Sequence, residues 1–368
     1  MPFTLPDFTP PDFKKPMFLK APIVDFEKVR QKGCAPTGYH ATSIYPEYFQ
    51  IKKGAWIFPP ESRMDCVVVK DQKGNLSVKE FRHLRVGDRV ALGRGENGEE
   101  GIFVHTGAFG FPEEHLDKFA FRTRITRETS FSIDYDDLYE LLEYERKEGF
   151  VLWVLGPAAV FDHDSREAFV GLVERGYVHG LLAGNALAVH DLEGALFGTA
   201  LGQEIYSKKA ADLGHYKHLD AINRIRGYGS IRKAVRKGAI QNGVMRSLIE
   251  KRIPYVLAGS IRDDGPLPEV IADVYQAQDR MRRLTAQSTT VIAMATQLHA
   301  IATGNMVPSY RVLPSGQVRP VYFYSVDMSE FAVTKLANRG SLTARSILTN
   351  VQDFVVTVER GLRKRFGQ

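Results

Sequence analysis

The apolar run Phe150-Val-Leu-Trp-Val-Leu155, which is followed by Gly156-Pro-Ala158, decides the fold of this chain. Four later stretches share its pattern of apolar residues that end on small or polar ones, at residues 178–183, 255–258, 291–295 and 321–326. Such short runs are typical of strands that are buried on both faces of a sheet. Helical patterns separate them, at residues 165–175, 188–201, 215–226, 239–251, 267–284 and 329–339. The alternation predicts an α/β domain with a parallel, Rossmann-like sheet.

The chain before this domain has a different pattern. Residues 37–126 contain short β-like runs separated by turns, which predict a small β-rich domain. Residues 1–36 contain seven prolines and five phenylalanines, so we expect an extended arm that packs on its own chain or clasps a neighbouring subunit. We therefore predict three parts: an arm (1–36), a β-rich domain (37–134) and a Rossmann-like domain (135–368).

Composition limits the class of protein. The chain has 368 residues, of which 44% are hydrophobic and 25% charged, as is typical of a globular protein and not of a disordered or fibrous one. No apolar run reaches the roughly 18 residues that a membrane span requires. Two cysteines form no disulfide framework, so we expect a cytoplasmic protein. The net charge is +6, and in the densest basic stretch, residues 224–237, the cations are spread over helical positions, which favours a solvated helix face over a nucleic-acid site.

Small residues follow the predicted strands, where ligands of open parallel sheets bind. They let a flat ligand approach the backbone, and the helices that begin there offer amides to a pyrophosphate. We predict a dinucleotide site formed by Gly156, Pro157, Ala158, Gly184, Asn185, Gly259, Ser260 and Thr296. Asp327, after the last run, is a candidate for the adenosine ribose and favours NAD over NADP; it also suits a helix N-cap. The Gly-x-Gly-x-x-Gly fingerprint is absent, which indicates a variant of the fold.

The stretch Ser260-Ile-Arg-Asp-Asp-Gly265 is the most polar of the strand ends. Arg262 suits a substrate carboxylate, and Asp263 or Asp264 suits an amine or its proton, although an Arg and Asp brace of the loop is the structural alternative. Asn185 suits a nicotinamide or a polar substrate group. His190 lies near a helix start, and His218 shares a helical face with His215, but two histidines without a carboxylate do not predict a metal site.

Four stretches resemble the archaeal-type ornithine cyclodeaminase family, whose proteins carry the LOR/SDH region: residues 155–160, 176–191 and 258–268, and Gly304-Asn-Met306. They are also similar to the C-terminal part of cyanobacterial fusions of arginine dihydrolase with ornithine cyclodeaminase. The resemblance is strong over residues 150–350. It is weaker upstream, in Gly38-Tyr-His-Ala-Thr-Ser43 and Met64-Asp-Cys-Val-Val-Val69.

The resemblance implies a deoxyhypusine-synthase-like NAD domain that converts L-ornithine to L-proline with loss of ammonia. NAD takes hydride from the α-carbon and later returns it, so the reaction has no net redox change. For this chain, it implies that Gly304 and Asn305 join the cofactor residues, that Arg262 binds the carboxylate, and that Asp263 or Asp264 and His190 or His218 transfer protons.

Two other activities stay open: a saccharopine- or opine-type dehydrogenase, which uses NAD stoichiometrically, and a non-catalytic NAD-binding regulatory protein. We expect a homo-oligomer on general grounds. The chain departs from the family pattern in a hairpin-like stretch, residues 310–320, which we expect beside the ligand face.

Overall fold

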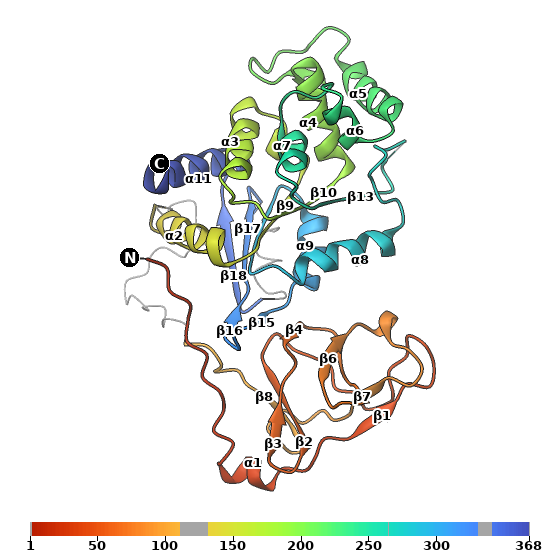
Figure 1. Cartoon of the computed structure of the whole chain (residues 1–368), viewed down its shortest axis with the longest axis vertical. Coiled ribbons are helices and arrows are strands. Elements are labelled where there is room, and N and C mark those ends of the chain that lie inside the picture. Colours follow the sequence, from red (N-terminus) through yellow and green to blue (C-terminus); the bar gives the residue numbers. More distant parts are fainter. Residues whose placement is uncertain (1, 111–131, 264, 330–340, 368) are drawn as a thin grey trace.

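The computed structural model describes residues 2–110, 132–263, 265–329 and 341–367 (Figure 1). A Rossmann-like domain contains one six-stranded sheet in which every pairing is parallel. Its strands, in chain order, are β9 (Val151–Leu155), β10 (Gly180–Gly184), β13 (Tyr255–Ala258), β14 (Thr290–Met294), β17 (Tyr322–Asp327) and β18 (Thr343–Leu348). The α/β prediction with a parallel sheet is confirmed. The sixth strand, β18, was not predicted, because Thr343-Ala-Arg-Ser is not an apolar run.

The order of strands across the sheet is β13-β10-β9-β14-β17-β18. Numbered along the chain, this is 3-2-1-4-5-6, the order of dinucleotide-binding domains. The direction of winding reverses between β9 and β14, so the carboxyl ends of these two strands form the topological switch point at which ligands bind. The sequence did not predict this order, since apolar runs do not indicate which strands pair.

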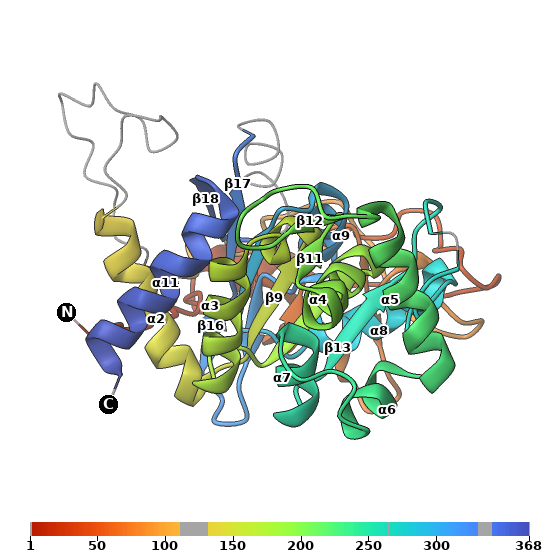
Figure 2. The same cartoon turned by 90° about the horizontal axis from the view of Figure 1, so that it is seen from above.

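Helices cover both faces of the sheet (Figure 2). Trp153 and Leu155 of β9 pack on one face, and Leu152 and Val154 of the same strand pack on the other. The first face is covered by α2 (Ser132–Glu148), η2 (Pro157–Val160), α3 (His163–Glu174), α4 (Asn185–Phe197), α5 (Gly214–Tyr228), α6 (Ile231–Arg236), α7 (Val244–Glu250) and α11 (Val351–Phe366). The second face is covered by α8 (Val274–Thr285) and α9 (Gln297–Met306).

Two helices are shorter than predicted, for local reasons. The pattern at residues 239–251 forms a helix only from Val244, because Gly243 before it has a φ of 102°. The pattern at residues 267–284 forms a helix only from Val274, where Asp273 caps the first turn. The predicted helix at residues 329–339 lies almost entirely outside the described residues.

The N-terminal domain consists of small antiparallel sheets (Figure 1). One sheet has the order β1-β7-β5-β6, and a second has the order β3-β2-β8. The elements are α1 (Pro16–Lys20), β1 (Phe26–Lys28), β2 (Glu47–Lys52), β3 (Ala55–Ile57), β4 (Glu61–Ser62), β5 (Val67–Lys70), β6 (Leu76–Lys79), η1 (Phe81–His83), β7 (Arg89–Ala91) and β8 (Ile102–Val104). The predicted β-rich domain is confirmed as a separate antiparallel region.

The proline-rich arm packs on its own chain. Phe3 lies 5.3 Å, ring centre to ring centre, from Tyr144 of the Rossmann-like domain, and Phe13 stacks on Trp56 of the N-terminal domain at 5.3 Å. Strand β1, which lies within the range expected for the arm, pairs with β7. These half-buried aromatic pairs hold the arm in place, since such a pair contributes about 0.5–1.5 kcal/mol beyond the area that it buries.

The hairpin at residues 310–320 joins the two domains. Its strands β15 (Tyr310–Val312) and β16 (Val318–Pro320) extend from β4 in a three-stranded antiparallel sheet. The Tyr310 hydroxyl donates to the carbonyl of Pro59 at 2.9 Å. The hairpin immediately precedes β17 and therefore lies at the amino ends of the parallel strands. The expectation that it lies beside the ligand face is wrong.

The remaining short strands, β11 (Thr199–Ala200) and β12 (Gln203–Glu204), form a hairpin after α4. Within the described part of the chain, the helices are too short or too polar to span a membrane.

Candidate functional site

The switch point between β9 and β14 is a place of close backbone approach. The amide of Gly156, after β9, donates to the carbonyl of Met294 at 2.8 Å. A Cβ atom on Gly156 would lie 1.8 Å from the carbonyl oxygen of Ala295, so only glycine fits. Ala295 itself has a left-handed φ of 55°, which is uncommon outside glycine and clusters at functional sites.

Two helices that begin beside the switch point have no side-chain cap. They are α4, after β10, and α9, after β14, and these two strands are the neighbours of β9 on its two sides. Side chains cap the first turns of α3, α6, α8 and α11 through Asp162, Ser230, Asp273 and Asn350, and Asp191 binds the first amides of α7. The helices α1 and α5 also lack a side-chain cap, but they do not follow a strand of the parallel sheet. The open amides and the helix dipole make α4 and α9 suited to an anion.

The polar loop after β13 is fixed to α4. The Asn185 side chain accepts a hydrogen bond from the amide of Leu267 at 3.1 Å and donates to Asp263 at 3.5 Å. The other oxygen of Asp263 accepts from the amide of Ser260 at 2.8 Å. Asn185 and Asp263 therefore brace the loop, whereas the structural alternative expected a brace of Arg262 with an aspartate. Arg262 is exposed, and Asp264 lies outside the described residues.

The two histidines predicted for proton transfer, His190 and His218, lie close to each other. His190 of α4 is buried, and its Nδ1 lies 2.8 Å from an oxygen of Glu193. Its ring centre lies 5.2 Å from that of Phe161 and 6.4 Å from that of His218 on α5. Among the contacts of the described residues, none joins His190 or His218 to Asn185 or Asp263. The structure thus brings the two histidines together, but apart from the polar loop.

Glu193 is fully buried and was not predicted. Its carboxylate accepts from Thr199 and from the amides of Leu201 and Gly202, in addition to its contact with His190. Burial raises the pKa of Glu193, but the hydrogen bonds from His190 and Gly202 outweigh it and leave the pKa below its ordinary value. The carboxylate is therefore charged and fixes the His190 ring.

Three predicted cofactor residues lie away from the switch point. Gly304 and Asn305 are in the last turn of α9, beyond the second face of the sheet, where the carbonyl of Asn305 accepts from Arg63 at 2.9 Å. They are separated from the carboxyl ends of β9 and β14 by the length of that helix. Asp327 ends β17, and its side chain accepts from the amide of Ser329 at 2.9 Å, as a capping residue would.

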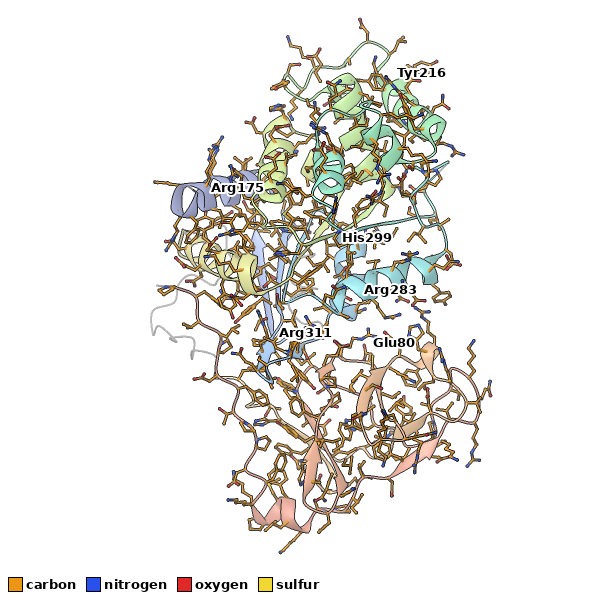
Figure 3. All side chains as sticks on the ribbon, viewed as in Figure 1. Glu80, Arg175, Tyr216, Arg283, His299 and Arg311 are labelled. Atoms are coloured by element: carbon orange, nitrogen blue, oxygen red, sulfur yellow. The ribbon has the colours of Figure 1, made fainter. Side chains whose placement is uncertain are left out.

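One residue at the switch point was missed. His299, in the first turn of α9, reaches across to β10: a Cβ atom on Gly184 would lie 3.0 Å from its Cε1 (Figure 3). Burial lowers the pKa of His299, and the charge of Asp263 opposes this only in part. Its position three residues after Thr296, a predicted strand end, was the one signal in the sequence that pointed to it.

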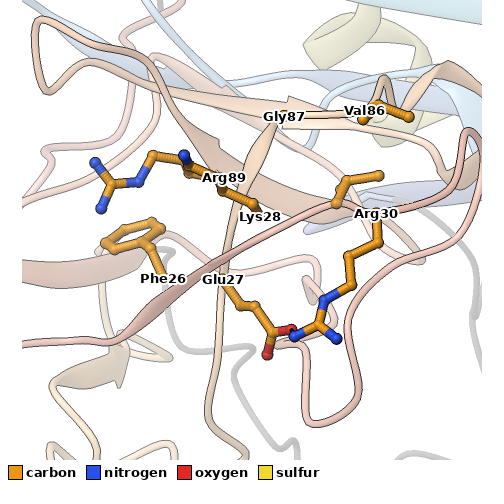
Figure 4. A pocket seen from close by; sticks show the side chains of 8 residues that line it. Phe26, Glu27, Lys28, Arg30, Val86, Gly87 and Arg89 are labelled. Carbon is orange, nitrogen blue, oxygen red and sulfur yellow. Dashed lines mark hydrogen bonds and ion pairs between the residues drawn. The ribbon is translucent and has the colours of Figure 1, made fainter.

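A cavity of about 570 Å³ lies elsewhere, on the N-terminal domain (Figure 4). It opens between β1 and the turn before β7, and its charged lining comprises Glu27, Lys28, Arg30 and Arg89. None of the residues predicted to bind cofactor or substrate lines it. The ends of β9, β10, β13 and β14 therefore remain the candidate site.

Residues 138–358 match the family described as arginine dihydrolase ArgZ-like, C-terminal, Rossmann fold. The ornithine cyclodeaminase of Methanopyrus kandleri is 37% identical over 93% of this chain and 79% of its own length. The bifunctional arginine dihydrolase/ornithine cyclodeaminase ArgZ of Synechocystis sp. is 34% identical over 93% of this chain, but only 47% of its own length.

Solved structures that are similar to this chain come from the same group of proteins. A conserved LOR/SDH protein of Methanococcus maripaludis has a TM-score of 0.80 and 32% identity, and the match covers 94% of this chain and 98% of that one. The ternary complex of AgrE with ornithine and NAD+ has a TM-score of 0.56 and 30% identity, over 94% of this chain and 47% of that one. The chain therefore belongs to the ArgZ-like ornithine cyclodeaminase family, as its sequence motifs predicted.

Proposed function

We propose that this chain is an NAD-dependent ornithine cyclodeaminase, which converts L-ornithine to L-proline and ammonia. The observation that carries the proposal is the pair of uncapped helices, α4 and α9, at the switch point of a sheet with dinucleotide-binding order. Membership of a family whose relatives are named for this activity supports it, as does the complex of AgrE with ornithine and NAD+.

The residues at the switch point fit NAD. The open amides of α4 and α9 would hold the pyrophosphate. Gly156 and Gly184 let Ala295 and His299 pack closely at the ends of β9 and β10, beside those amides. Ser260 and Thr296 follow β13 and β14 at the same edge of the sheet, and Asp327 stays a prediction for the adenosine ribose. When bound, NAD supplies the redox chemistry, because it accepts hydride from the α-carbon and then returns it.

The polar loop would hold the amino acid. Arg262 has no ion-pair partner among the described residues, so its guanidinium is available to bind the carboxylate through two hydrogen bonds. Asp263 would attract the ammonium group, and Asn185 keeps Asp263 in position. His190, His218 and Asp264 stay predictions for proton transfer.

The assembly and location of the protein are also proposals. Residues 201–216 contain the exposed apolar side chains Leu201, Leu213 and Tyr216, which support a homo-oligomer in which a second copy covers them. Free Cys34 and Cys66 support a cytoplasmic location. Light scattering of the purified protein tests the assembly.

The test begins with the nucleotide that the purified protein retains. We expect denaturation to release NAD or NADH, identified by mass spectrometry. The protein should then convert ornithine to equal amounts of proline and ammonia without accumulating NADH. A dehydrogenase of saccharopine or opine type would instead accumulate NADH as substrate is used, and a regulatory NAD-binding protein would release no ammonia.

Arg262→Ala tests the substrate site. Loss of a charge-assisted carboxylate contact should raise KM for ornithine at least about tenfold and leave the affinity for NAD unchanged. Arg236→Ala, an exposed arginine on α6, is the matched control and should leave KM unchanged. Equal KM values for the two variants would remove Arg262 from the site.

A further inference from the structure

His299 occupies the centre of the candidate site. It belongs to α9, which follows β14, yet its ring lies against Gly184 at the end of β10, with Cε1 3.0 Å and Nδ1 3.8 Å from the position of a Cβ atom there. Because β9 lies between β10 and β14, the side chain reaches from one neighbour of β9 to the other. The absence of a side chain at Gly184 is what leaves room for the ring.

The imidazole of His299 is polar, sheltered and unpaired. No described residue donates to or accepts from either ring nitrogen. Six other histidines have such partners: His40, His83, His105, His163, His179 and His190. His215 and His218 also have none, but they lie on α5 at the outside of the domain, whereas His299 faces the strand ends.

The surroundings keep this ring neutral. Burial lowers the pKa of His299 below its ordinary value of 6.5, and Asp263, on the loop after β13, is the charged group that acts against this. A neutral imidazole at pH 7 is able to accept a proton, and a carboxylate beside it stabilises the imidazolium that results.

Resting on the proposed function, we propose that His299 is a catalytic residue, the base that removes a proton from the α-ammonium group of the amino-acid substrate. One N–H bond of the substrate breaks, and an N–H bond forms on the ring. The lone pair that is released forms the C=N bond as the α-carbon loses hydride to the NAD of the proposed function. The amine is oxidised, the cofactor is reduced, and the proton stays on His299.

The same proton is available for the second half of the reaction. After the δ-amine has attacked the α-carbon, the α-nitrogen must gain a proton to leave as ammonia. The imidazolium of His299 supplies it and returns to the neutral form. The imidazole thus moves one proton off the α-nitrogen and back onto it, and no proton is consumed at the ring over a turnover.

His299→Gln tests the role, with His215→Gln as the matched loss of an exposed histidine. General-base catalysis contributes about 10²–10⁴-fold, so we expect kcat of His299→Gln to fall at least about 100-fold, while KM and the affinity for NAD change little. The fall of kcat on the acid side of the wild-type pH profile should disappear. Free imidazole should restore part of the activity of His299→Ala, which a merely structural role would not allow.

A readout independent of turnover is the NMR signal of His299 in protein labelled with ¹³C-histidine. The signal is assigned by its absence from His299→Gln. It should titrate below pH 6.5 in the protein stripped of nucleotide, and it should shift when NAD is added. The exposed His215 is the internal reference and should not respond to NAD.

The outcomes separate the two proposals. If wild type forms no proline or ammonia from ornithine, the proposed function fails, whatever the variants do. If wild type is active and His299→Gln keeps kcat within about threefold, with the acid limb intact, the role of His299 is refuted. Loss of activity together with weakened NAD binding and no rescue by imidazole also refutes it, because that result indicates a binding role.

Discussion

The two ends of the parallel sheet are built differently. At the amino ends, Glu145 of α2 and Arg319 of β16 form an ion pair in which both side chains are fully buried. Thr289 and Thr290 donate to the same carboxylate. At the carboxyl ends, α4 and α9 lack caps and His299 has no partner among the described residues. One end satisfies its polar groups within the chain, and the other leaves them for a ligand.

This difference separates stability from function in space. A buried pair that loses one member leaves an uncompensated charge, so the amino ends should dominate the free energy of unfolding. The carboxyl ends have fewer internal contacts to lose, so substitutions there should act mainly on binding and turnover.

Glu145→Ala should have the largest effect on stability. It leaves Arg319 buried without a counter-charge, and we expect the free energy of unfolding to fall by about 3–5 kcal/mol. Glu250→Ala removes an exposed ion pair with Arg246 and should cost less than about 1 kcal/mol. Urea denaturation of both variants measures the difference. Similar values for the two would contradict the distinction between the ends.

Gly156→Ala should have an intermediate effect on stability and a large one on cofactor binding. The new Cβ atom would meet the carbonyl of Ala295, so the backbone at the switch point must move, at a cost of about 1–3 kcal/mol. We expect the affinity for NAD, measured by calorimetry, to fall at least about tenfold.

Gly227→Ala is the control for Gly156→Ala. This glycine lies in α5, and a Cβ atom there would have no neighbour within 4 Å. It should raise stability by up to about 1 kcal/mol because alanine is the better helix former. Unchanged NAD affinity in Gly156→Ala would show that the switch point does not bind the cofactor.

Substitution of His179 should have the smallest effect on stability, and that effect depends on pH. Its Nδ1 accepts a hydrogen bond from the amide of Val151 at 2.9 Å, at the amino end of β9. Burial lowers the pKa of His179 below 6.5, while Glu145 opposes this. The unfolded chain therefore binds more protons, and stability is lost as the pH falls from 6.5 towards the pKa of the folded state.

His179→Gln removes this titration. Between pH 7 and pH 5, we expect wild type to lose up to about 1 kcal/mol more stability than the variant. His215→Gln, on the surface of α5, should follow the wild-type curve. Thermal unfolding over this pH range is the measurement, and parallel curves for wild type and His179→Gln would contradict the prediction.

The sequence predicted the elements better than their arrangement. The run Tyr255-Val-Leu-Ala258 is a strand with the predicted bounds, because buried strands have a local apolar signature. Strand β18 escaped prediction because Arg345 and Ser346 interrupt that signature. The order of strands, and the place of the hairpin at residues 310–320, depend on pairings between distant segments that no local pattern records.

The same limit applies to the site. Gly156 and Gly184 were identified because small residues at strand ends have a local meaning. His299 was missed because its importance comes from lying against Gly184, which is far away in the sequence. Gly304 and Asn305 were included on a motif alone, and the structure places them at the far end of α9.

The pairing of β4 with the hairpin has a consequence during synthesis. Ser62 of β4 contacts Ser309 across a separation of 247 residues, so this edge of the N-terminal domain has no partner until most of the chain has left the ribosome. At 5–20 residues per second, the wait lasts about 12–50 seconds. During that time β4 presents open backbone groups to other nascent chains, and the early half of the molecule depends on its late half to close them.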